Sequence, residues 1–193
     1  MAFYELAENS PSRFIAAAMG LIEPFLRDEL ETKQIPAPDK IAPFALAFAA
    51  QVPNPANTPN NRGVGRIVFL YDENQFETWG SNMRVIAYGK SPLEQDIGIE
   101  EDMANYCWEW LTRALERHDA KFSNEAGTIT KIVSTGMGSL SQDSNSSEVE
   151  IRASWSPQDD NFGPHLAAWQ DLIAGMAGFE LGGDKVTRLA RSK

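Results

Sequence analysis

The spacing of apolar residues near the start of the chain predicts one helix and one weak strand. Apolar residues recur every three or four positions between Phe14 and Ile22, which is helical spacing. Ser10 is the expected N-cap, with proline at the first helical position, and Pro24 should end or kink the helix. A weak extended stretch follows from Leu30 to Ile35.

Alternation of large and small residues predicts the main strands. In the segment FALAFAAQV, Phe44, Leu46, Phe48, Ala50 and Val52 alternate with alanines at 45, 47 and 49, although this alanine richness is also compatible with a helix. A separate segment, Asp72–Ser81, is too long for a tight hairpin turn, so we expect local structure around Phe76 and Trp79. The strands expected from such patterns are Phe44–Val52, Arg66–Tyr71, Met83–Tyr88, Thr128–Val133 and Glu148–Trp155.

The longest helical pattern runs from Ile99 to His118. Its apolar stripe includes Cys107 and Trp110, and its charges are placed favourably for the helix dipole. Trp108 falls about 120° from the centre of the stripe, so the apolar surface is broader than one face requires. Another helix of the chain or a second subunit would have to cover this flank, and a symmetric homodimer is one solution. A last helix should begin near Pro164.

The resulting order is α-β-β-β-β-α-β-β-α, with the first strand weak. Strands that follow one another without regular helix alternation favour the α+β class. We therefore expect a mainly antiparallel sheet of five to six strands, with about three helices. Residues 1–184 should form one domain, and residues 185–193 should form a basic, disordered tail.

Composition narrows the class of protein. The net charge is −10, and the 13 basic and 27 acidic residues before position 185 leave −14 on the domain itself. Such a body repels a phosphate backbone, which makes nucleic-acid binding an unfavoured function. Neither an apolar stretch of about 20 residues nor a secretory signal pattern is present. A single cysteine, Cys107, excludes an internal disulfide, so we expect a cytoplasmic protein without membrane contact.

The sequence carries no recognisable catalytic or metal-binding motif. It lacks a Walker A loop, HExxH, CxxC, an EF-hand loop and G-x-S-x-G, so we expect neither a cofactor nor a metal. His118 is expected to cap a helix end. Cys107 should be a buried structural thiol, because nothing in its surroundings would activate it. An enzymatic function is therefore not indicated, although it stays open.

Five residues are the candidates for a binding site. In the strand Glu148–Trp155, Arg152 shares the polar face with two glutamates; this face is either solvated or a polar floor for a carboxylate or phosphate. Arg84 could join it if the two strands are neighbours, and His165 could line the same pocket. Trp79, in a loop, and Trp108, off the main stripe, are the tryptophans best suited to a partner surface.

Several segments together resemble one known family. The most specific is VEIRASWSP at 149–157, and the others are IPAP at 35–38, IAPF at 41–44, WEWL at 108–111 and GTIT at 127–130. With His165 and Trp169 they resemble an actinobacterial family of unknown function, "domain of unknown function three thousand", from about Phe14 to Phe179. The insertion at 53–61 and the cysteine at 107, where a glycine is expected, depart from the pattern. The resemblance transfers no activity, and a loose association with a ribonuclease-D-like neighbour gene implies RNA metabolism at most.

Three hypotheses follow for the function. The preferred one is a non-enzymatic protein-interaction module that binds a partner protein or a second copy of itself. The alternative is a small-molecule-binding protein, or an unrecognised enzyme, with a pocket near Arg152. The weakest is an accessory factor in RNA metabolism, which the charge of the domain disfavours.

Overall fold

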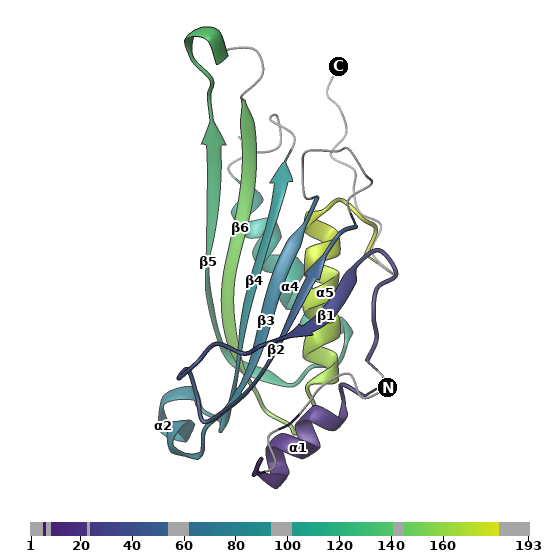
Figure 1. Ribbon diagram of the computed structural model, residues 1–193, viewed down its shortest axis with the longest axis vertical. Helices are drawn as coiled ribbons and strands as arrows, with labels where there is room; N and C mark the ends of the chain where they lie inside the picture. Colours follow the sequence, from purple (N-terminus) through teal and green to yellow (C-terminus); the bar gives the residue numbers. More distant parts are fainter. Residues whose placement is uncertain are drawn as a thin grey trace.

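Six antiparallel strands form one sheet, and the two long helices pack against one of its faces (Figure 1). The computed structural model describes residues 6, 9–22, 24–53, 62–93, 102–140 and 145–181. The strands lie side by side in the order β1-β2-β3-β4-β6-β5. Their bounds are β1 (Glu31–Ile35), β2 (Phe44–Gln51), β3 (Val64–Tyr71), β4 (Met83–Leu93), β5 (Phe122–Ser134) and β6 (Ser146–Pro157).

Four α-helices accompany the sheet within the described residues. They are α1 (Ser12–Met19), α2 (Phe76–Trp79), α4 (Met103–Arg117) and α5 (Gly163–Met176), with 3-10 turns at Glu73–Gln75 and Gly138–Leu140. Helices α4 and α5 pack against each other, and α5 lies against β2, β3 and β4. The predicted α+β class with an antiparallel sheet is confirmed, with α2 as a helix beyond the three expected.

The elements differ from the predicted ones chiefly at their ends. Pro11, not Ser10, is the N-cap residue of α1. Strand β4 continues past Tyr88 to Leu93 because each of its residues from Val85 onward pairs with β6. The added length comes from pairing with a strand far along the chain, which a local pattern does not contain.

Strand β2 shows how the alternating pattern builds the core. Leu46 and Phe48 are buried on the face toward the helices, and Phe48 contacts Phe69 of β3 ring to ring. The alanines at 45, 47 and 49 therefore point to the opposite face, because successive side chains of a strand alternate. We call this second face, which α4 and α5 do not cover, the open face of the sheet.

Two glycines allow α5 to lie close to the sheet. A Cβ added at Gly65 of β3 would stand 2.5 Å from Cδ1 of Ile173, and one at Gly89 of β4 would stand 2.8 Å from the same atom. Trp169, also on α5, donates a hydrogen bond from its indole to the Tyr88 carbonyl at 3.1 Å. The glycines thus determine how deeply the helix is buried.

The apolar flank of α4 is covered within the chain. The Trp108 ring lies against β5, where a Cβ added at Gly127 would be 2.8 Å from Cζ3 of Trp108. Trp110, which the pattern placed on the inward stripe, is only half-buried, as Trp108 is. A strand of the same sheet therefore covers the flank at Trp108, and this flank no longer requires a second subunit.

Some sequence-based predictions concern residues outside the described ranges. They are the helix start at Ile99, the Pro- and Asn-rich insertion and the basic tail at 185–193. No helix among the described residues is long and apolar enough to cross a membrane.

Candidate functional site

One row of residues crosses the open face at right angles to the strands. The strand registers place each member directly opposite the next, so all of them share this face. From β1 to β5 the row, which we call the cationic row, is Lys33, Ala49, Arg66, Tyr88, Arg152 and Thr128. Because neighbouring strands are about 4.8 Å apart, its three cations recur about every 10 Å.

A second row runs parallel to the first, and each of its members is two residues away from a member of the first row on the same strand. From β1 to β5 it consists of Glu31, Gln51, Val64, Lys90, Glu150 and Thr130. In this row the amide of Gln51 donates to the Glu31 carboxylate at 3.1 Å. The charges here are mixed in sign, whereas the cationic row carries only positive ones.

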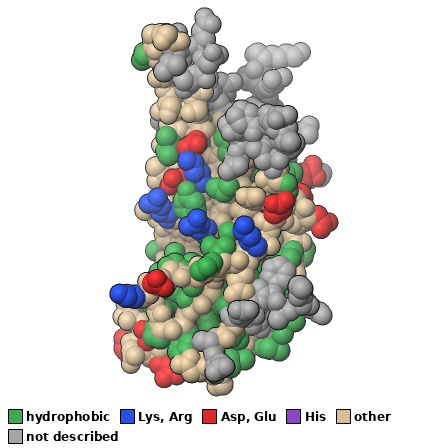
Figure 2. Space-filling view, in the orientation of Figure 1, with side chains coloured by type: hydrophobic (Ala, Val, Ile, Leu, Met, Phe, Trp, Pro, Cys, Tyr) green, Lys and Arg blue, Asp and Glu red, His purple; other side chains and the backbone are tan. Residues whose placement is uncertain are grey.

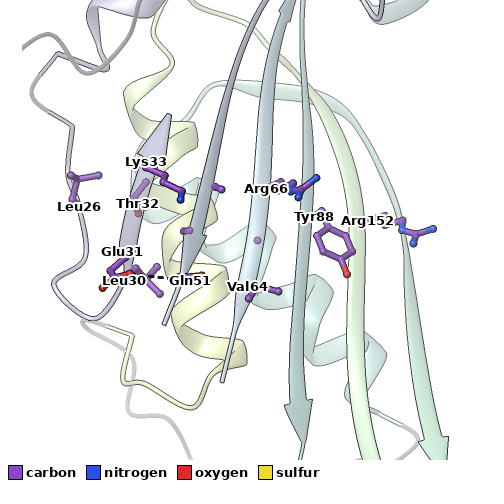
Figure 3. A pocket seen from close by; sticks show the side chains of 13 residues that line it. Leu26, Leu30, Glu31, Thr32, Lys33, Gln51, Val64, Arg66, Tyr88 and Arg152 are labelled. Carbon is purple, nitrogen blue, oxygen red and sulfur yellow. Dashed lines mark hydrogen bonds between the residues drawn. The ribbon is translucent and has the colours of Figure 1, made fainter. Parts of the chain in front are cut away.

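A groove of about 880 Å³ lies between the two rows. Figure 3 shows Lys33, Arg66 and Arg152 on its upper side, with Glu31, Gln51 and Val64 below them. Leu26 and Leu30, from the segment that precedes β1, also line the groove: Leu26 lies beyond the sheet edge, whereas Leu30 lies at β1 and is buried in the core. Its volume is within the range of small-molecule sites, about 300–1,000 Å³.

The basic side chains of the groove have few acidic partners. Within the described residues, neither Lys33 nor Arg66 has an ion-pair partner, and both side chains are exposed. Arg152 contacts Glu150 at 3.2 Å, and its guanidinium carbon lies 5.9 Å from the centre of the Tyr88 ring. Figure 2 shows basic side chains gathered across the middle of this face. On a protein with a net charge of −10, this is a local reversal of sign.

Tyr88 separates Arg66 from Arg152 in the cationic row. Burial and the nearby Glu150 raise the pKa of its phenol above the ordinary value. The hydroxyl therefore stays protonated at neutral pH and can donate a hydrogen bond. Tyr88 thus adds a flat, neutral surface between two positive groups.

Arg84 lies on the same face as Arg152 but plays a different structural part. Its guanidinium donates to Ser154 Oγ at 2.6 Å, to Ser156 Oγ at 2.9 Å and to the Asn124 carbonyl at 2.9 Å. These three acceptors are neutral, and burial lowers the pKa of Arg84. The side chain joins β4 to β6 and to the irregular start of β5, two rows away from Arg152 along β4 and outside the groove lining.

The other predicted site residues lie away from the groove. Trp79 is half-buried in α2, where its carbonyl accepts hydrogen bonds from Asn124 and Ser156. Trp108 packs against β5 on the helix side of the sheet. Of the five predicted residues, the groove lining therefore contains Arg152 alone.

His165 is fully buried beneath the sheet's helix face. The Trp155 indole donates to its Nδ1 at 2.9 Å, so the ring proton is on Nε2, which has no partner among the described residues. Burial lowers the pKa of His165 to about 4. The side chain is neutral at physiological pH and belongs to the core.

The structure also reveals a buried ionic cluster that sequence patterns did not indicate. The Asp171 carboxylate accepts from Arg27 Nη1, Arg117 Nη1 and His118 Nε2, each at 2.9 Å. Burial opposes ionisation of Asp171, but the hydrogen bonds from Arg27 and His118 outweigh it, and its pKa is lowered. The Phe25 ring packs on His118 at 5.4 Å between centroids. This cluster fastens the segment before β1 to α4 and α5.

Lys33 and Arg66 are the groove residues that sequence reasoning missed. Arg66 is one charged residue in a mostly apolar strand, and Lys33 lies in a mostly polar one; both patterns are also those of an ordinary solvated face. The available signal was the run of alanines at 45, 47 and 49 on the outward face of β2, which leaves space between Lys33 and Arg66. Among the described residues, no three His, Cys, Asp or Glu side chains come together as a metal site would require.

Comparison with known proteins places the chain in a family without assigning it an activity. No curated protein and no solved structure matches it. Residues 10–183 match the family described as "Protein of unknown function (DUF3000)", in agreement with the resemblance found in the sequence. The match covers almost all of the six-stranded sheet and its helices, and the chain is therefore a member of the DUF3000 family.

Proposed function

We propose that this protein binds an anionic small molecule in the groove across the open face of its sheet. The observation that carries the proposal is the cationic row, in which Lys33 and Arg66 are exposed and have no acidic partner among the described residues. Arginine and lysine placed around one concavity are the usual means of holding a carboxylate or phosphate. The alternative pocket near Arg152 is thus favoured over a general protein-interaction module.

The chemistry of the lining supports binding rather than catalysis. Among the described residues, the groove lining includes no histidine and no cysteine, and Tyr88 supplies the hydroxyl on the open face, since Thr32 Oγ1 donates to Gln170 on the helix side. A catalytic nucleophile needs a neighbouring base, and the lining offers neither a hydroxyl–histidine pair nor a cysteine–histidine pair. The interaction hypothesis rested on the absence of catalytic motifs and on Trp79 and Trp108, and the Trp108 ring packs against β5 of the same chain.

Inorganic pyrophosphate, titrated by isothermal calorimetry at low ionic strength, tests this proposal. We expect saturable binding that Arg66→Gln weakens about tenfold or more, because a hydrogen bond to a charged group contributes about 1.5–3 kcal/mol. The matched control is Arg113→Gln, which removes an exposed arginine paired with Glu109 on α4. Equal affinities of wild type and Arg66→Gln, or no binding at all, would contradict the proposal.

A further inference from the structure

The width of the groove restricts the shape of its ligand. Its two walls are residues i and i+2 of the same strands, which a strand separates by about 6.6 Å. An α-helix with side chains is about 10–12 Å across and cannot sink between them. The occupant is therefore thin, with a cross-section close to that of a single extended chain.

The length of the groove matches an elongated molecule. The lining runs from β1 through β2, β3 and β4 to Arg152 on β6, which is four strand intervals or about 19 Å. It continues to Leu30 at β1 and to Leu26 beyond it. One end is thus apolar, and the other end carries Tyr88 and Arg152.

Where it crosses β2 and β3, the floor of the groove offers no free hydrogen-bonding groups. It consists of the backbone at Thr32, Ala50 and Gly65, whose own side-chain positions face the helices, and the wall beside it is lowest at the Ala49 methyl group. Strands β2 and β3 pair with a neighbour on each side, so their backbone groups are already used. A peptide or nucleotide chain across this floor would leave its own polar groups without partners there, whereas an alkyl chain has none to satisfy.

We infer that the ligand is a linear amphiphile, an unbranched apolar chain with a carboxylate or phosphate head group. This inference rests on the proposed function and names its ligand class. The head group lies beside Arg66, on the side of the Tyr88 ring that separates this arginine from Arg152. The chain crosses the floor beside Ala49 toward Leu26 and Leu30.

A chain-length series tests the inference directly. Octanoate, decanoate and dodecanoate, each kept below its critical micelle concentration, are titrated against the protein at constant ionic strength. Burial of methylene groups in a groove open on one side should raise affinity by about two- to fourfold for each added carbon. Dodecyl phosphate should bind in the same way as dodecanoate. Affinity that does not change with chain length overturns the inference.

Two substitutions distinguish binding of the ligand's apolar chain from binding of its head group. Ala49→Leu narrows the groove between Lys33 and Arg66 and should reduce dodecanoate binding about tenfold or more, a larger loss than it causes for pyrophosphate, which has no chain to place there. Thr128→Leu adds the same side chain to the same row on β5, outside the groove lining, and should leave both unchanged. Thermal unfolding of each variant shows that it is folded, and the wild-type length series does not depend on either variant.

The two proposals can fail separately. If pyrophosphate binds in an Arg66-dependent manner and dodecanoate binds no more tightly, the proposed function stands and the amphiphile is excluded. If dodecyltrimethylammonium binds as tightly as dodecanoate, the head group is not recognised and the inference is overturned. Binding of a single-stranded oligonucleotide or an acidic peptide in preference to dodecanoate likewise overturns it.

Discussion

Arg27 and Asp171 form a buried ion pair at 2.9 Å, although 144 positions separate them in the chain. Their side chains are 8% and 4% exposed. Arg27 also donates to Glu29 at 2.8 Å and to the Glu180 carbonyl at 2.9 Å. The pair fixes the segment that carries Leu26 and Leu30, so it also shapes the apolar end of the groove.

Asp171→Asn should lower the free energy of unfolding by about 3 kcal/mol. The substitution leaves Arg27 buried without its full counter-charge, and breaking a buried pair from one side typically costs about 3–5 kcal/mol. Urea unfolding measures the change. The control is Asp160→Asn, which breaks an ion pair with Arg13 whose side chains are 50% and 36% exposed and should cost about 1 kcal/mol or less. Equal losses would show that the buried cluster is not a main source of stability.

The free energy of unfolding should decrease as the pH is lowered, over the pH range between the unfolded and folded pKa values of His165. Burial lowers its pKa from 6.5 to about 4, so between these values the unfolded state binds a proton that the folded state does not. Stability is therefore fully present above pH 6.5 and declines below it, by at most about 1.4 kcal/mol per pH unit from this group. The lowered pKa of Asp171 acts in more acidic solution, below about pH 3.9, the ordinary Asp value.

The variant His165→Gln isolates this effect. A glutamine carbonyl can still accept the Trp155 indole proton, but it has no charge to gain in the unfolded state. Unfolding free energies measured from pH 7.5 to pH 4 should decline less steeply for the variant than for the wild type. Parallel curves would assign the acid sensitivity to other groups.

Gly65→Ala should destabilise the protein by about 1–3 kcal/mol. The new methyl group would meet Cδ1 of Ile173 at 2.5 Å and Cζ2 of Trp169 at 2.8 Å, and overpacked sites cost energy of this order. Adding Ile173→Val removes the nearest atom, so the double variant should lose less stability than the sum of the two single ones. Additive losses in chemical denaturation would mean that α5 moves away instead.

Much of the fold was predictable because periodicity records which face of an element is buried. The alternation in Phe44–Val52 predicted a strand, and β2 is found at Phe44–Gln51. The segment around Phe76 and Trp79 does contain local structure, as its length and composition suggested. The ends of β4 and β5 were underestimated because those residues gain their partners from β6.

The candidate site was predictable only in part. Arg152 was singled out by its place on a polar strand face, and it does line the groove. Lys33 and Arg66 were not, because an isolated charge on a strand has the same pattern whether it lines a groove or faces open solvent. Asp171 lies within a mostly apolar helix, and its role depends on Arg27 from a distant segment.

The sequence by itself determined the composition of the elements and the two faces of the sheet, since side-chain direction follows from the local period of two or 3.6 residues. Only the tertiary structure decided which strands are neighbours and in which register they pair. That choice brings Lys33, Arg66 and Arg152 into one row and places small residues between its cations and the opposite wall. Strand pairing depends on contacts between residues far apart in the chain, and these contacts leave no periodic trace in any one segment.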